Sequence, residues 1–137
     1  MTQLSISGFD PMDTRQAQLL NSLQLAHVGD ALWDLLVRTD LIYKGRNVRN
    51  MHKDAINRVN AGAQARVMEH WLPYLTEVEA DVVRRGRNAH PHHAAPKNQD
   101  VVDYHHATAL EALVGYLYLT GQQERLTELF KISQEVL

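Results

Sequence analysis

Apolar residues recur at every third or fourth position along most of the chain, which is the spacing of one buried face of an α-helix. The pattern predicts a turn and a short helix near the N-terminus and then five longer helices, over residues 22–43, 50–72, 76–87, 100–120 and 123–136. Gly45, Pro73 and Gly121 stand where three of these helices are predicted to end, because glycine and proline interrupt helices. No stretch alternates apolar and polar residues for long enough to predict a strand. The sequence therefore predicts an all-α fold.

Length and composition limit the class of protein. A chain of 137 residues, of which 45% are hydrophobic and 22% charged, is expected to form one domain over 1–137. Cysteine is absent, which excludes thiol nucleophiles, thiolate zinc sites and iron–sulfur clusters and fits a reducing compartment. The N-terminus lacks the segments of a secretion signal, and no apolar run reaches the roughly 18 residues of a membrane span. We therefore expect a cytoplasmic protein without a membrane segment.

The net charge of −2 hides two basic tracts. Seven basic residues, Lys53 among them, and only two acidic ones lie between 38 and 66. The second tract has four basic residues and no acid, namely Arg84, Arg85, Arg87 and Lys97. Basic tracts on an otherwise acidic protein indicate a site for polyphosphate or nucleic acid. The alternative is that these residues are solvated helix faces.

Two apolar helices each carry acids in unusual places. Asp30 and Asp34 are the only charged residues of segment 22–37, and Glu111 is the only acid of segment 104–120. The apolar residues of 22–37 surround almost the whole helix, which predicts burial on most sides. An isolated carboxylate there costs several kcal/mol unless it has a partner. A metal ion is one candidate partner for Asp30 and Glu111. The alternatives are a helix cap or an arginine for Asp30 and a solvated or interface position for Glu111, and for Asp34 a surface position is favoured.

Glycines give a second indication, because a glycine inside a helix costs about 1 kcal/mol relative to alanine. Gly29 precedes Asp30, and Gly115 lies one turn beyond Glu111 on the same face. Two helices that cross closely at these glycines would bring Asp30 and Glu111 together. Paired carboxylates of this kind bind Mg²⁺, which keeps waters that a substrate phosphate can displace.

Five short motifs resemble one family. The segment LAHVGDA at 25–31 resembles the signature helix of ribonuclease III, and ALEALVGYLYL at 109–119 resembles its second acidic helix. The motifs MHK at 51–53, RGRNA at 85–89 and PKNQDV at 96–101 are similar to those of the short branch, Mini-ribonuclease III. The resemblance runs in the right order from about residue 20 to 129, so the motifs are specific together although each alone is weak.

The resemblance implies an all-α, homodimeric endonuclease that cuts double-stranded RNA with Mg²⁺ and leaves 5′-phosphate and 3′-hydroxyl ends. Asp30 and Glu111 would be the catalytic metal ligands. The branch lacks a separate RNA-binding domain and processes the precursor of 23S ribosomal RNA, which makes ribosomal proteins candidate partners. The RNA-contacting loop of the branch corresponds to the tract of Arg84, Arg85, Arg87 and Lys97, and Lys53 belongs to the second candidate tract.

The chain also departs from ordinary ribonuclease III. Two of the four acidic positions of that family are occupied here by Ala26 and Thr108, as is typical of the Mini branch. We expect the histidines near the acids (His27, His105 and His106) to be packed or hydrogen-bonded rather than catalytic. For the loop histidines (His90, His92 and His93) we favour an RNA-facing loop over a transition-metal site, because the loop holds no acid or cysteine to complete the ligand set.

Two other functions compete with the nuclease. One is a non-catalytic RNA-binding or ribosome-associated module on the same fold, against which the retention of Asp30 and Glu111 argues. The other is a metal phosphohydrolase for small nucleotides, which the absence of a His-Asp dipeptide disfavours.

Overall fold

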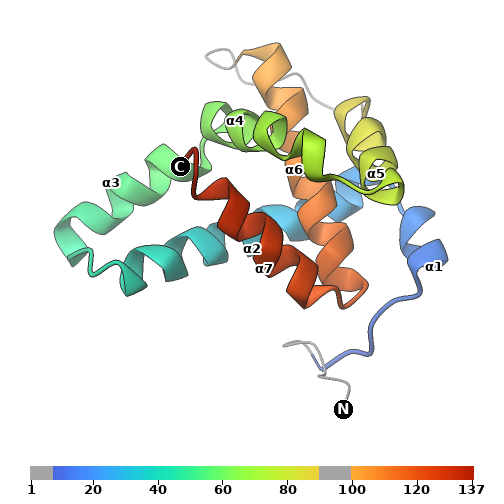
Figure 1. Ribbon diagram of the computed structural model, residues 1–137, viewed down its shortest axis with the longest axis horizontal. Helices are drawn as coiled ribbons and strands as arrows, with labels where there is room; N and C mark the ends of the chain where they lie inside the picture. The colour runs from blue at the N-terminus through green and yellow to red at the C-terminus, as the bar shows by residue number, and fades with distance from the viewer. Residues whose placement is uncertain (1–7, 90–99) are drawn as a thin grey trace.

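The computed structural model describes residues 8–89 and 100–137, and over these ranges the protein is all-helical, as predicted. Its elements are α1 (Thr14–Gln18), α2 (Ser22–Tyr43), α3 (Val48–Val59), α4 (Ala61–Trp71), the 3-10 turn η1 (Leu72–Tyr74), α5 (Glu77–Arg87), α6 (Val101–Leu119) and α7 (Gln123–Ser133) (Figure 1). No helix within these ranges is long and apolar enough to cross a membrane.

Helix α6 is the centre of the fold. Its residues from Ala107 to Leu117 are buried, with Glu111 the one partly exposed position among them. Helices α2, α4, α5 and α7 pack around it (Figure 1). A helix that is apolar on nearly all sides is expected at such a position. The core beside it includes Trp33 of α2 and Trp71 of α4, whose rings meet edge-on with centroids 5.7 Å apart.

Capping residues set most helix ends where the sequence predicts them. Thr76 and Glu79 form a capping box at the start of α5, and the Asp100 carboxylate accepts hydrogen bonds from two amides of the first turn of α6. Gly45 follows α2 with a φ of +76°, a backbone conformation that favours glycine. The last helix ends at Ser133, three residues before the predicted end, and the chain continues in turns.

The prediction of one helix over 50–72 is wrong. The chain forms two helices, α3 and α4, which meet at Asn60. The side-chain oxygen of Asn60 accepts from the amide of Ala63, and its side-chain nitrogen donates to the carbonyl of Ile56. One asparagine therefore caps both the end of α3 and the start of α4. Apolar spacing alone does not detect this local competition with the helix backbone.

Helix α2 is less buried than its apolar sequence predicts. Within one copy of the chain, the buried residues form a single stripe that includes Gly29, Trp33 and Val37. Leu35 and Ile42, on other sides, are 52% and 62% exposed. The C-terminal half of α2 and the whole of α3 extend from the bundle as an arm, here called the α2–α3 arm (Figure 1). This arm therefore leaves apolar side chains exposed in a single copy of the chain.

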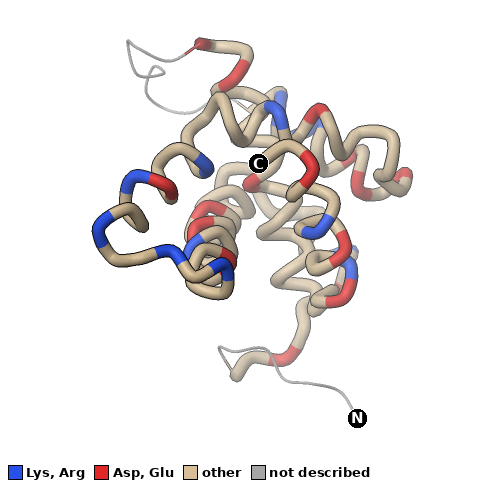
Figure 2. Tube along the Cα trace, turned by 60° about the vertical axis from the view of Figure 1, so that its left-hand side comes forward, with Lys and Arg blue, Asp and Glu red and all other residues tan. Residues whose placement is uncertain are grey.

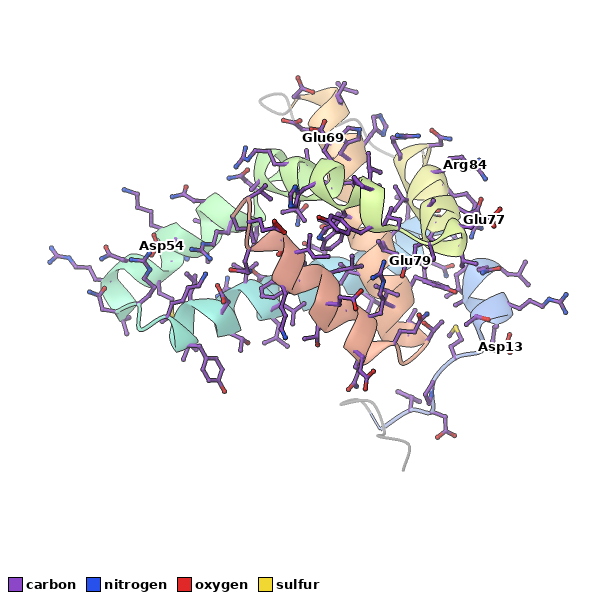
Figure 3. All side chains as sticks on the ribbon, viewed as in Figure 1. Asp13, Asp54, Glu69, Glu77, Glu79 and Arg84 are labelled. Carbon is purple, nitrogen blue, oxygen red and sulfur yellow. The ribbon has the colours of Figure 1, made fainter. Side chains whose placement is uncertain are left out.

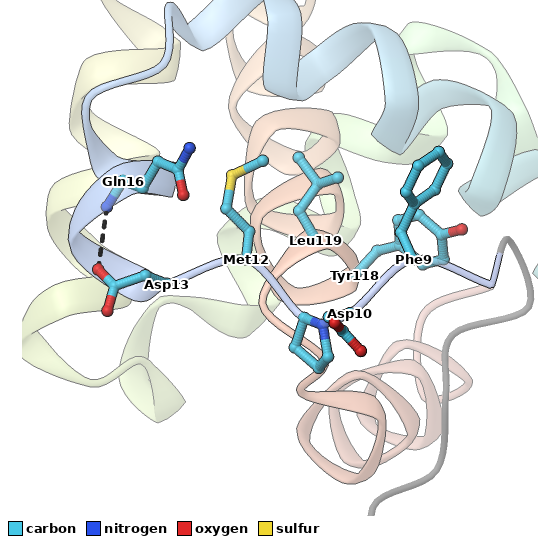
Figure 4. Close-up of a pocket in the computed structure, with 8 residues that line it drawn as sticks. Phe9, Asp10, Met12, Asp13, Gln16, Tyr118 and Leu119 are labelled. Atoms are coloured by element: carbon cyan, nitrogen blue, oxygen red, sulfur yellow. Dashed lines mark hydrogen bonds between the residues drawn. The ribbon is translucent and has the colours of Figure 1, made fainter.

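The segment before α1 lies against the end of α6 (Figure 4). The amide of Met12 donates to the carbonyl of Leu119 over 2.7 Å. Beside it, a pocket of about 390 Å³ is lined by this segment and by the end of α6, with Phe9, Met12, Tyr118 and Leu119 among its residues. The contact ties the first described residues to the central helix.

A buried ion pair joins α5 to α7. Glu79, marked in Figure 3, is 4% exposed and accepts hydrogen bonds from Nε and Nη2 of Arg125 at 2.9 and 2.8 Å. Burial would raise the pKa of the Glu79 carboxyl, but hydrogen bonds from Arg125 and Thr76 outweigh it and lower this pKa below its usual value. Glu79 therefore stays ionised and holds the two helices together.

Candidate active site

The site lies where α2 crosses α6. A β-carbon on Gly29 would be 1.7 Å from the carbonyl oxygen of Glu111, and a β-carbon on Gly115 would be 2.0 Å from the carbonyl oxygen of Leu25. Backbone therefore touches backbone at the crossing, an approach that only glycine allows. The predicted close crossing at these two glycines is confirmed.

This crossing brings Asp30 and Glu111 together. Asp30 follows Gly29 and is exposed, whereas Glu111, one turn before Gly115, is partly buried. The two carboxyl groups are within hydrogen-bonding reach of each other. The predicted meeting of the two acids, which come from distant parts of the chain, is therefore confirmed as geometry.

The surroundings of Glu111 disfavour its negative charge. Burial, then the hydrogen bond with Asp30 and the negative charge of Asp30, raise the pKa of Glu111 to about 9, and a hydrogen bond from Gln64 acts in the opposite direction. No basic side chain of the described residues contributes to this shift. Two crowded carboxyl groups without a basic neighbour form a site that a cation stabilises.

The donor set fits a hard divalent cation. Carboxylate oxygens are the ligands that Mg²⁺ prefers, and one or two of them are sufficient because this ion keeps several waters. Within 8–89 and 100–137, no group of three or more histidine, cysteine, aspartate or glutamate side chains is placed to hold a metal ion. Within the described residues, the two carboxyl groups are therefore the side-chain ligands that this crossing offers to a cation.

We expect the raised pKa to make stability depend on pH when divalent ions are removed. The folded protein holds the Glu111 proton more tightly than the unfolded chain, so the free energy of unfolding should fall as pH rises from about 4.5 to about 9. Between pH 6 and 8.5 the slope should be about 1 to 1.4 kcal/mol per pH unit, because one full proton corresponds to about 1.4 kcal/mol per unit. Urea unfolding in EDTA between pH 6 and 8.5 measures it. The Glu111→Gln variant should lack this pH dependence of the free energy of unfolding. If the free energy of unfolding falls equally with pH in the wild type and in this variant, Glu111 is not the group responsible.

Gln64 is a neighbour of the two acids that the sequence did not predict. It lies on α4, is 3% exposed, and is close enough to the Glu111 carboxyl to lower the pKa of that group. The only signal in the sequence is an uncharged polar residue inside an alanine-rich run, AGAQA at 61–65. That signal does not indicate which helix the side chain faces.

The other residues near the acids have structural partners. The hydroxyl of Thr108, one turn before Glu111, donates to the carbonyl of Tyr104 over 2.9 Å, and Ala26 is buried. Asp34 pairs with Arg38 at 3.0 Å on α2, which agrees with the surface position favoured for it. These residues add no ligand to the pair of acids.

The histidines near the acids differ from one another. His27 is exposed, whereas His105 and His106 are partly buried on α6. Nδ1 of His106 lies 3.8 Å from a carboxylate oxygen of Glu69, which is marked in Figure 3. The expectation of packed or hydrogen-bonded side chains therefore agrees with His105 and His106 but not with His27.

The candidate RNA-binding residues fall into three groups. Arg84 pairs with Asp81 at 2.5 Å, and Arg85 donates to the carbonyl of Gln18 over 2.6 Å. Arg87 and Lys53 are exposed. The remaining ones lie outside the described residues, namely Lys97 together with His90, His92 and His93.

The exposed cations lie on two surfaces. Arg87 lines a cleft of about 390 Å³ together with Asn88, His105 and His106. Lys53 lies on the α2–α3 arm, along which basic positions gather (Figure 2). Arg87 and Lys53 are therefore more available to an external anion than Arg84 and Arg85, which have partners within the chain.

The all-helical fold and the paired acids at its central crossing define a ribonuclease III domain, and residues 23–122 match the model of the Ribonuclease III domain family. The chain is 49% identical to Mini-ribonuclease 3 of Symbiobacterium thermophilum over 85% of this chain and 89% of that protein. It is 50% identical to Mini-ribonuclease 3 of Brevibacillus brevis, over 85% and 87%. The chain belongs to the Mini-ribonuclease 3 branch of the ribonuclease III family.

A solved structure has the same fold. The crystal structure of protein FN1578 from Fusobacterium nucleatum superposes with a TM-score of 0.76 at 29% sequence identity, covering 86% of this chain and 94% of that one. Membership of the family makes the protein an endoribonuclease of the class that acts on double-stranded RNA, and it implies a divalent metal ion.

Proposed function

We propose that this protein is a Mg²⁺-dependent endoribonuclease with one catalytic domain, in which Asp30 and Glu111 are the catalytic metal ligands. The observation that carries the proposal is the meeting of these two carboxyl groups at the crossing of α2 and α6. Their mutual repulsion is relieved when a cation lies between them. The glycines fix the positions of both acids before any ligand arrives.

The reaction is hydrolysis of a phosphodiester bond. A bound Mg²⁺ would supply the positive charge that activates a water and stabilises the departing oxygen. Asp30 and Glu111 would hold the metal ion in place, and no side chain acts as a covalent nucleophile. Water forms a bond to phosphorus while the bond to the 3′ oxygen breaks, which leaves 5′-phosphate and 3′-hydroxyl ends.

RNA binding is proposed for the surface of the same domain. Double-stranded RNA is recognised mostly through phosphates and 2′-hydroxyl groups across its wide minor groove, so scattered cations on two elements are sufficient. Arg87 and Lys53 are the first candidates, because both are exposed. Arg84, Arg85 and Lys97 complete the tract proposed from the sequence.

A homodimer is proposed to cover the apolar side of the α2–α3 arm. Along α2 and α7 runs a groove of about 560 Å³, with Leu35, Leu36, Tyr43 and Phe130 among its residues. Tyr43 is 87% exposed in one copy of the chain. A second copy would bury this surface and would give the assembly two sites for the two strands of RNA.

The precursor of 23S ribosomal RNA in the cytoplasm is the proposed substrate, with ribosomal proteins as candidate partners.

One assay tests the reaction. The purified protein is incubated with structured double-stranded RNA and, separately, with free nucleotides, in Mg²⁺ or in EDTA. Discrete fragments with 5′-phosphate ends that appear in Mg²⁺ and not in EDTA are the expected result. RNA binding without cleavage would instead identify a non-catalytic module, and turnover of nucleotides alone would identify a phosphohydrolase. Either outcome would refute the nuclease proposal.

Charge reversal of Arg87 should weaken RNA binding. We expect Arg87→Glu to lower the affinity for double-stranded RNA and to reduce the dependence of log affinity on log salt by roughly one for each phosphate that the protein no longer neutralises. The measurement is a binding titration at several salt concentrations in EDTA, where cleavage is blocked. Lys131→Glu makes the same charge change on an exposed residue of α7, and is expected to have a smaller effect. An unaltered salt slope in Arg87→Glu would remove this residue from the binding surface.

A further inference from the structure

Four polar side chains of the described residues are buried, and three of them have purely structural partners. Thr108 donates to a carbonyl in its own helix, Ser133 does the same in α7, and Glu79 pairs with Arg125. The fourth, Gln64, lies where α4 packs against α6, and its carboxamide is close enough to the Glu111 carboxyl to lower the pKa of that group. A buried carboxamide costs free energy unless it is hydrogen-bonded, so its interaction with an active-site acid requires an explanation.

The fold holds Gln64 in place from both sides. Asn60 caps α4 one turn earlier, and the neighbouring residues Ala63 and Ala65 are buried, which lets α4 lie close against α6. Farther along α4, Met68 and Trp71 lie in the core. The backbone that carries Gln64 is therefore fixed relative to Glu111.

The type of side chain matters as much as its position. A carboxamide donates hydrogen bonds through its nitrogen and carries no charge. It can therefore orient a carboxylate without neutralising it. A lysine or arginine here would supply a positive charge that competes with a cation, and an apolar residue would leave the buried side of Glu111 without a donor.

We propose that Gln64 is a positioning residue, which holds the side chain of Glu111 in the orientation that binds the divalent ion. This inference rests on the proposed function, and it adds a third helix, α4, to the two that carry the acids. Residues that hydrogen-bond to metal ligands affect metal affinity about 10- to 100-fold in other proteins. Gln64 should act through the metal ion and not through RNA binding.

The test compares two variants of Gln64 with a matched control. Gln64→Met keeps the length of the side chain and removes the donor, and Gln64→Asn keeps the amide and withdraws it by one methylene group. Ser133→Ala removes a different buried hydrogen bond, one that is confined to α7. Two quantities are measured, namely the dissociation constant of Mn²⁺ for the protein without RNA and the Mg²⁺ concentration that gives half-maximal cleavage.

Both Gln64 variants are expected to weaken Mn²⁺ binding and to raise the half-saturating Mg²⁺ concentration about tenfold, with the KM for RNA unchanged. Partial unfolding would also raise this Mg²⁺ concentration, because an ion that binds only the folded protein shifts the folding equilibrium. Both measurements are therefore made under conditions in which urea unfolding curves show each variant to be fully folded, and the readout then separates positioning from stability. Ser133→Ala should resemble the wild type in both measurements. If the wild type cleaves RNA and the Gln64 variants need no more Mg²⁺ than it does, the inference is wrong while the proposed function stands. If the wild type itself neither binds Mn²⁺ nor cleaves, both fail.

Discussion

Glu111→Gln is expected to reduce the rate of RNA cleavage by roughly 1,000-fold or more. The substitution preserves the shape of the side chain at the crossing but replaces a charged ligand by a neutral one. A bound metal ion supplies several kcal/mol of transition-state stabilisation, and each 1.4 kcal/mol corresponds to about tenfold in rate. Asp30→Asn should have a similar effect, because the two acids share one cation in the proposed site. The measurement is the cleavage of a double-stranded RNA at saturating Mg²⁺.

The control for these variants is Asp34→Asn on the same helix. Asp34 lies one turn beyond Asp30 but pairs with Arg38 near the surface, so its loss should change the rate by less than about threefold. RNA binding in EDTA should be retained by all three variants, because the residues proposed to bind RNA are cations elsewhere on the surface. Cleavage by Glu111→Gln at a rate close to that of the wild type would refute the assignment of the metal ligands.

The two acids could be predicted from the sequence because their positions conflict with their surroundings. A carboxylate in an apolar helix and a glycine in the middle of that helix are each unfavourable. Asp30 with Gly29 and Glu111 with Gly115 repeat this conflict in two helices. The close crossing of α2 and α6 explains the glycines and brings the two acids together, so features that are locally unfavourable predicted a contact between distant parts of the chain.

Other features could not be predicted from the sequence, because the spacing of apolar residues does not show the hydrogen bonds that single side chains make. Asn60 divides the predicted helix over 50–72 through hydrogen bonds of its own side chain, and this division turns α4 toward α6. Gln64 reaches Glu111 only as a consequence of that turn. The hydrogen bond behind Glu111 thus depends on one capping residue, whereas the acids follow from the pattern of two whole helices.

The burial of α2 was overestimated for a different reason. Apolar residues around a helix indicate that it will be covered, but they do not indicate by which molecule. Leu35, Ile42 and Tyr43 remain more than half exposed in one copy of the chain. Their apolar character therefore supports the proposed homodimer, and sequence reasoning on a single chain assigned it to the core.

Gly29→Ala is expected to destabilise the protein by about 4 kcal/mol or more, a large share of the roughly 5–15 kcal/mol that stabilises an ordinary domain. The added β-carbon would lie 1.7 Å from the carbonyl oxygen of Glu111. That oxygen belongs to the backbone of the central helix, so the clash cannot be relieved by rotation of a side chain and requires α2 and α6 to separate. The measurement is the free energy of unfolding in urea, with EDTA present so that metal binding does not contribute.

Substitutions of two other glycines serve as controls for Gly29→Ala. A β-carbon on Gly86 would meet the α-carbon of Ala109 at 3.0 Å, whereas one on Gly62 would approach no described atom closer than 3.4 Å. Gly86→Ala should therefore cost less than Gly29→Ala. Gly62→Ala should be neutral or stabilise the protein by up to about 1 kcal/mol, because alanine favours the helix. Equal stabilities of Gly29→Ala and Gly62→Ala would mean that the helices do not touch at this crossing, and the two acids would then have no reason to meet.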